Sequence, residues 1–133
     1  MSDRTVVFVC LHGAAKSLIA ATLFQRLADE RGLAVRSTFA GTEPDPAIQP
    51  NVVARLLEEG VDVRPLRPRR VTRDDLASAW RVVSFGCDLA ALAPDARIER
   101  WDDVPAVSED YGRARDVIAA RVRMLVGQAS CAQ

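Results

Sequence analysis

A short, continuous apolar run near the start of the chain, Thr5 to Val9, constrains the fold most strongly. It is rich in β-branched residues and does not alternate with polar ones, which is typical of a strand buried on both faces of a parallel sheet. After a loop of small residues, apolar side chains recur at three- and four-residue spacing from Ser17 to Arg31, and Gly32 follows. This pattern predicts a helix, so the chain opens as a β-loop-α unit.

The same alternation of strand and helix continues to the end of the chain. Further strands are predicted at residues 33–39, 81–85 and 97–101, and further helices at about 52–57, 72–79 and 108–126. Thr72 and Asp75 have the spacing of a capping box, and the tail with Cys131 is expected to fray. We therefore predict the α/β class, with a four-stranded parallel sheet flanked by helices on both faces.

Length and composition limit the range of functions. The chain has 133 residues, 49% apolar and 27% charged, which suits one globular domain over residues 1–133. Its formal net charge is zero, so no overall field favours nucleic acid or a membrane surface. No signal peptide and no run of membrane length is found, and we expect a cytoplasmic protein that binds a small partner.

Cysteine and histidine usage argues against a disulfide framework and against a metal site. The three cysteines, Cys10, Cys87 and Cys131, are an odd number, which indicates free thiols. There is one histidine and no closely spaced cysteine pair, so we expect no metal and no bound cofactor.

The candidate site is the loop CLHGAAKS, residues 10–17, which holds the only histidine and the only lysine of the chain. Its backbone N–H groups and the following helix N-terminus could bind an oxyanion and favour a reactive thiolate at Cys10. Ser17 could cap the helix, or it could donate to that thiolate or to a departing group. The residues expected to bind the oxyanion are Leu11, His12, Gly13, Ala14, Ala15 and Lys16.

Other interpretations of the loop stay open. Cys10 could be a small buried residue at the end of a strand, and His12 could simply fill the loop surface, although imidazole is the side chain that changes charge near neutral pH. A nucleotide-binding P-loop is less favoured because Cys10 and Ala15 stand where that motif has glycines.

The loop resembles the active-site loop of the low-molecular-weight protein tyrosine phosphatase family, in which a cysteine is followed by five residues, an arginine, and a serine or threonine. The closer likeness is to the arsenate reductases of that fold, because Leu11-His12-Gly13 is similar to their valine-histidine-asparagine run. The resemblance continues through Ala40-Gly41-Thr42-Glu43-Pro44, Pro50-Asn51-Val52-Val53, Glu59-Gly60-Val61-Asp62, Arg67-Pro68, Phe85-Gly86-Cys87, and Trp101 ahead of Pro105-Ala106. It implies the same four-stranded parallel fold.

The resemblance also implies site roles. Cys10 would attack phosphorus or arsenic, and Ser17 would stabilise its thiolate. An aspartate before a proline would protonate the leaving oxygen. Reductase relatives pass oxidation to a second cysteine near Cys87, or to thioredoxin, glutaredoxin or a small external thiol. The substrate would be phosphate, arsenate or a phosphorylated molecule.

Three positions depart from the family pattern. Lys16 stands at the arginine, which keeps the charge and loses the two-pronged geometry, and Gly13 stands at the asparagine. Val104 precedes Pro105 where the acid belongs, so Asp103 is our candidate acid, with Asp102 as the alternative.

The third reductase cysteine is absent from residues 88–93, so a relay would use Cys10 and Cys87, borrow Cys131, or pass to an external thiol. We therefore expect an arsenate reductase-like or phosphatase-like enzyme that uses Cys10. An oxyanion-binding or regulatory homologue without efficient turnover is the alternative. A thiol redox sensor built on Cys10 and Cys87 is a weaker one.

Overall fold

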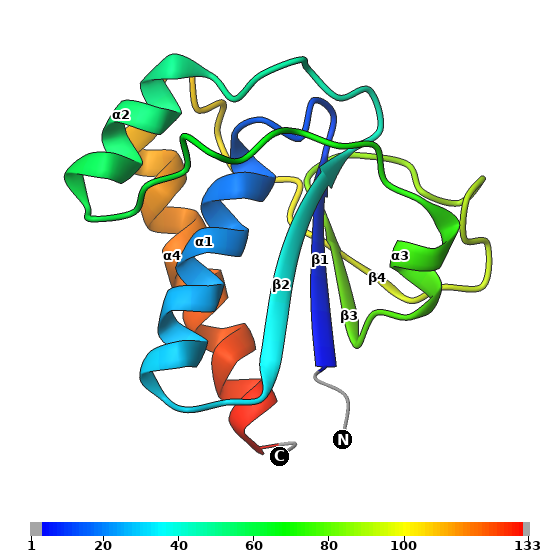
Figure 1. Cartoon of the computed structure of the whole chain (residues 1–133). Helices are drawn as coiled ribbons and strands as arrows, with labels where there is room; N and C mark the ends of the chain where they lie inside the picture. The colour runs from blue at the N-terminus through cyan, green and yellow to red at the C-terminus, as the bar shows by residue number, and fades with distance from the viewer. Residues whose placement is uncertain (1–3, 132–133) are drawn as a thin grey trace.

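The computed structural model describes residues 4–131. One sheet contains all the described strands, in the order β2-β1-β3-β4, and every neighbouring pair is parallel. The strands are β1 (Arg4–Cys10), β2 (Val35–Gly41), β3 (Arg81–Ser84) and β4 (Ile98–Arg100). The predicted four-stranded parallel sheet is confirmed (Figure 1).

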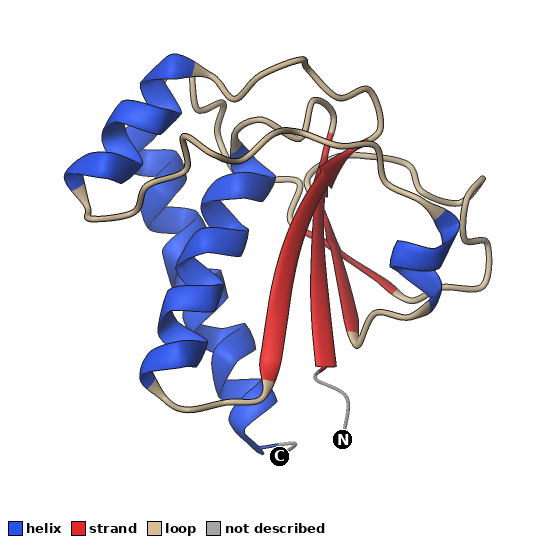
Figure 2. Ribbon diagram, viewed as in Figure 1, coloured by secondary structure: helices blue, strands red, loops and turns tan. Residues whose placement is uncertain are grey.

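Helices cover both faces of this sheet, as predicted (Figure 2). They are α1 (Lys16–Glu30), α2 (Pro50–Glu58), α3 (Arg73–Ala77) and α4 (Tyr111–Cys131). The long helices α1 and α4 lie together on one side, with α2 next to them, and the short α3 lies on the other side. Within residues 4–131, no helix combines the length and the apolar character that a membrane span requires.

The central position of β1 explains its unbroken apolar run. Val6 and Phe8 pack in the core under α1 and α4, whereas Val7 and Val9 pack in the core on the α3 side. All of these side chains are at most 1% exposed. A strand with a partner on each edge and a core on each face has no position for a polar residue.

The element boundaries differ from the prediction mainly at the helix ends. The last helix begins at Tyr111, not Ser108, because residues 107–109 form a turn and the Asp110 carboxylate accepts from the N–H of Arg113. The prediction of a frayed tail is wrong for Cys131, which belongs to α4, and the rest of that tail, residues 132–133, lies outside the described residues. Ala129 is fully buried and its carbonyl accepts from the Arg4 guanidinium at 2.9 Å, so the last turn stays helical.

The loops that follow the strands gather at one end of the sheet, while the first and last described residues lie near the opposite end (Figure 1). The loop after β1 begins at Leu11 and leads directly into α1. In parallel α/β sheets, ligands bind at this end of the strands. The fold therefore places the predicted cysteine loop where a site is expected.

Candidate active site

A pocket of about 200 Å³ opens above the end of β1. It is lined by Cys10, Leu11, His12, Ala14, Ala15, Lys16, Gln49, Phe85, Ala106, Val107 and Ser108. The structure thus brings the predicted loop together with the segment after Pro105. Of the residues expected to bind the oxyanion, all but Gly13 line the pocket.

The thiol at the pocket floor has a hydroxyl partner. Cys10 Sγ lies 3.0 Å from Ser17 Oγ, and both residues are buried, at 7% and 0% exposed. Ser17 does not cap α1, because the residue before the helix is Ala15 and no side chain caps it. Capping is thus excluded, and the contact with the thiol agrees with donation to a thiolate, since a hydroxyl at this distance can make that hydrogen bond.

The electrostatics of the pocket favour an anion. The first turn of α1 contains no acidic residue, so the partial positive charge of its free N–H groups is not compensated there. No carboxylate belongs to the described residues that line the pocket, whereas Lys16 does. This field would favour a bound oxyanion.

Lys16 connects the cysteine loop to the segment before Pro105. Its ammonium donates a hydrogen bond of 2.9 Å to the backbone carbonyl of Val104, and the bond is partly buried. The Val104 side chain is itself buried, at 4% exposed, in the core under α1 and α4. The position expected to carry an acid therefore presents a carbonyl to a lysine.

The structure explains why residue 13 is a glycine. Its φ is +60°, and a Cβ built there would lie 2.8 Å from the backbone N of Gly41. A Cβ on Gly41 would likewise lie 2.7 Å from the backbone N of Gly13. A glycine at position 13 therefore lets the loop pack directly against the end of β2.

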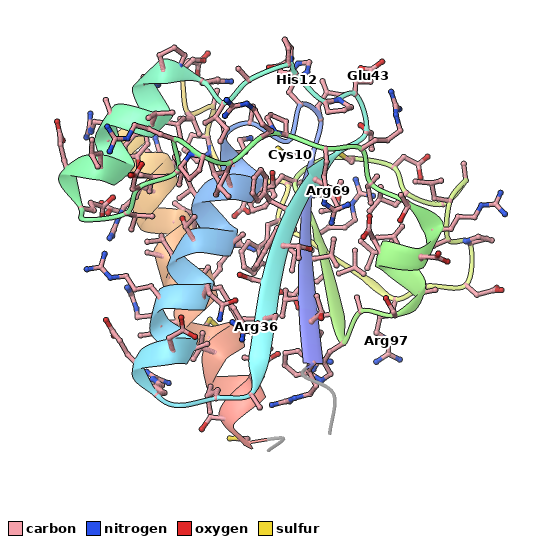
Figure 3. The ribbon with its side chains drawn as sticks, viewed as in Figure 1. Cys10, His12, Arg36, Glu43, Arg69 and Arg97 are labelled. Atoms are coloured by element: carbon pink, nitrogen blue, oxygen red, sulfur yellow. The ribbon has the colours of Figure 1, made fainter. Side chains whose placement is uncertain are left out.

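Backbone hydrogen bonds from the segment after β2 brace the loop instead. The N–H groups of Glu43 and Asp45 donate to the carbonyls of Leu11 and His12, at 2.8 and 3.0 Å. His12 Nδ1 lies 3.1 Å from the Glu43 carbonyl and 3.3 Å from an Asp45 carboxylate oxygen. Figure 3 shows Cys10, His12 and Glu43 together at this end of the molecule. The imidazole thus contributes to holding the loop against residues 43–45.

Neither candidate aspartate lines the pocket. Asp103 pairs with Arg121 of α4 at 2.6 Å and its side chain is 66% exposed, while Asp102 pairs with Arg100 at 2.9 Å. Our placement of Asp103, or of Asp102, at the leaving oxygen is not supported by this geometry. Each aspartate instead lies at the surface beside a guanidinium, and Val104, which follows them, is buried in the core.

Cys87 does not line the pocket. Ser84 Oγ accepts from the N–H of Cys87 at 2.9 Å and fixes the turn after β3, and Cys87 packs in the core on the α3 side. Burial raises the pKa of the Cys87 thiol, and a hydrogen bond from Thr42 opposes this shift in part. All three cysteines are free thiols, and Cys131 is exposed near the far end of α4.

Several lining residues were not predicted. Gln49 precedes α2, Phe85 follows β3 and packs edge-on against Trp101 at 5.6 Å, and Val107 and Ser108 belong to the turn before α4. Of these residues, only Phe85 could have been found from the sequence, because it belongs to the stretch Phe85-Gly86-Cys87 that resembles the family. Within residues 4–131, no three histidine, cysteine or acidic side chains are grouped as a metal ion would need.

The structure thus places a buried cysteine, paired with a serine, at a pocket beyond the end of the central strand of a parallel α/β sheet. The model of the family "Low molecular weight phosphotyrosine protein phosphatase" matches residues 5–104. The chain belongs to this family.

Individual relatives include both reductases and proteins of the same fold. A Halobacterium salinarum protein described as "Putative arsenate reductase" is 32% identical over 121 residues, which cover 86% of this chain and 85% of that protein. The thioredoxin-dependent arsenate reductase of Corynebacterium glutamicum superposes with a TM-score of 0.82 at 27% identity, over 99% of this chain and 64% of that one. YfkJ of Bacillus subtilis has a TM-score of 0.88 at 20% identity, over 100% and 98% of the two chains, and supports the fold alone.

Proposed function

We propose that this protein is an enzyme in which the Cys10 thiolate attacks the central atom of a bound tetrahedral oxyanion. One observation carries the proposal: Cys10 Sγ lies 3.0 Å from Ser17 Oγ beneath a pocket that Lys16 lines and no described carboxylate enters. A thiol stabilised as a thiolate and a site for an anion above it are the two requirements of nucleophilic attack on phosphorus or arsenic. The protein needs no bound cofactor for this step.

Arsenate reduction with an external thiol is the first candidate reaction. The sulfur of Cys10 bonds to arsenic, and one hydroxide of the arsenate takes a proton from solvent and departs as water. A second thiolate then attacks the Cys10 sulfur, the S–As electron pair passes to arsenic, and arsenite leaves a disulfide behind. Because Cys87 does not line the pocket, the second thiol would be external, such as thioredoxin, glutaredoxin or a low-molecular-weight thiol. The relatives described as arsenate reductases support this candidate.

Hydrolysis of a phosphomonoester is the second candidate, and the position of Cys87 favours it. With no other described thiol in the pocket, a phosphorylated Cys10 would be open to attack by water rather than by an internal thiol. The family description supports the same chemistry.

The free thiols of all three cysteines suit a reducing compartment such as the cytoplasm.

Binding without turnover is the alternative to both reactions, since the side-chain acid is missing from the pocket. The redox-sensor interpretation gains less support, because Cys87 does not line the pocket with Cys10.

The test compares turnover in the protein and in two matched serine variants. Arsenite formation from arsenate is measured with thioredoxin, glutaredoxin or glutathione, and phosphate release is measured from an aryl phosphate. Cys10→Ser should abolish either activity, whereas Cys87→Ser, which also replaces a buried thiol, should keep it. Saturable phosphate binding with no turnover in either assay would refute the enzyme proposal in favour of a binding protein.

A further inference from the structure

Lys16 stands out among the pocket residues because the structure joins its ammonium to the segment that lacks an acid. Nζ donates to the carbonyl of Val104, the residue directly before Pro105, at 2.9 Å. That bond holds the ammonium between the cysteine loop and the late segment. An ammonium has three N–H donors, so two remain for a ligand in the pocket.

Few other described groups lining the pocket could give a proton. The pocket has no carboxylate, and the Asp103 carboxylate is paired with Arg121 outside it. His12 lines the pocket, but its Nδ1 faces the Glu43 carbonyl and Asp45. Ser108 offers only a hydroxyl. Lys16 is therefore the charged donor that lines the pocket and is also hydrogen-bonded to Val104, the residue before Pro105.

We propose that Lys16 gives the proton to the departing oxygen, in addition to holding the anion. This proposal rests on the proposed function, because it concerns the leaving group of the same reaction. As the Cys10 sulfur bonds to phosphorus, the bond from phosphorus to the ester oxygen breaks and its electron pair stays on oxygen. That oxygen takes a proton from Nζ, so an alcohol departs and Lys16 becomes a neutral amine.

The second half of the reaction returns the proton. Water attacks phosphorus, the S–P bond breaks with its electron pair returning to sulfur, and the amine of Lys16 takes one proton from that water. The products are inorganic phosphate, the Cys10 thiolate and the Lys16 ammonium, so the site is restored. The Val104 carbonyl can accept from either form of Lys16 and keeps Nζ in place throughout.

This role accounts for a lysine at this position. All 17 other basic residues of the chain, counting lysine and arginine, are arginines, so lysine here is not a matter of composition. A guanidinium would bind the oxyanion in a two-pronged way but stays charged in proteins and cannot give up its proton. Lysine exchanges that geometry for a proton that can be transferred.

Lys16→Arg separates the two roles, because it keeps the charge and removes the transferable proton. Turnover is measured on p-nitrophenyl phosphate, whose phenolate departs without a proton, and on phenyl phosphate, whose more basic phenolate needs one. We expect Lys16→Arg to stay within several-fold of the parent on the first ester and to lose on the order of 100-fold on the second. Inhibition by phosphate reports binding in each variant.

Controls distinguish this role from others. His12→Gln should leave the ratio of the two turnover rates unchanged. If Lys16→Arg lowers turnover of both esters equally, Lys16 only binds the anion and the proposal is overturned. A change in the ratio of the two turnover rates in His12→Gln would overturn it as well. If the arginine variant does not fold, Lys16→Ala with added ethylamine replaces it, and the absence of rescue on phenyl phosphate counts against the proposal. No turnover of either ester by the parent would refute hydrolysis itself and this role with it.

Discussion

Replacing Gly41 with alanine should loosen the cysteine loop without changing the side chain of any residue that lines the pocket. The new Cβ would lie 2.7 Å from the backbone N of Gly13 and 2.8 Å from the carbonyl carbon of His12. Backbone atoms cannot rotate away, so the loop must shift. Overpacking of this kind costs about 1–3 kcal/mol.

Two further glycines separate the clash from the backbone conformation. Gly13→Ala combines the clash with a positive φ, which costs an L-residue about 1–2 kcal/mol more. Gly32 has a φ of +65° but nothing within 4 Å of its Cβ position, so Gly32→Ala carries the conformational cost alone. We therefore expect Gly13→Ala to be more destabilising than Gly41→Ala, and Gly32→Ala to cost about 1 kcal/mol.

The assay measures the free energy of unfolding in urea together with phosphate affinity by calorimetry. Gly41→Ala and Gly13→Ala should lower both quantities, because the loop amides lose their alignment toward the anion. Gly32→Ala lies at the other end of α1 and should lower stability only. If Gly41→Ala keeps the stability and phosphate affinity of the parent, the close contact between the loop and β2 does not brace the site.

Three other outcomes follow from the site. Ser17→Ala should slow the alkylation of Cys10 by iodoacetamide at pH 7 severalfold, because the thiolate loses its hydroxyl donor; an unchanged rate would contradict that role. Asp103→Asn should change turnover less than about twofold and the free energy of unfolding by less than about 1 kcal/mol, because the ion pair of Asp103 with Arg121 is exposed. A large loss of turnover would instead indicate that Asp103 is the general acid. Burial raises the pKa of Cys87 above the ordinary thiol value of 9.0, so the contribution of the protonated thiol to folding stability is complete below pH 9 and is lost as pH rises through the raised pKa. In urea unfolding, the free energy of unfolding should therefore fall more steeply at alkaline pH in the parent than in Cys87→Ala. Equal slopes in the two proteins would contradict this prediction.

The sheet and its flanking helices could be predicted because each leaves a periodic pattern. The run from Val6 to Val9 is apolar throughout since β1 is the central strand, and α1 shows the three- and four-residue spacing of a helix with one buried face. The capping box of Thr72 and Asp75 was likewise predicted and is present. Such local patterns are enough to predict whether a segment is a helix or a strand, and at which end of the sheet the cysteine loop lies.

The contacts that give the loop its chemistry could not be predicted, because they join distant residues without any period. Lys16 and Val104 are 88 positions apart, and nothing in the chain marks a backbone carbonyl as the partner of an ammonium. The pairing of Asp103 with Arg121 depends on where α4 lies, which the local pattern leaves open. Gly13 differs from the family pattern for a reason that only the approach of β2 reveals.

Alkylation of Cys10 in the presence and absence of anions tests the central claim most directly. Iodoacetamide modification at pH 7 is followed by mass spectrometry at each cysteine, with exposed Cys131 as an internal reference. We predict that phosphate and arsenate protect Cys10 with saturation and leave Cys131 unchanged, because the anion covers the thiol in the pocket. Equal modification of Cys10 at every anion concentration would show that no oxyanion binds above it.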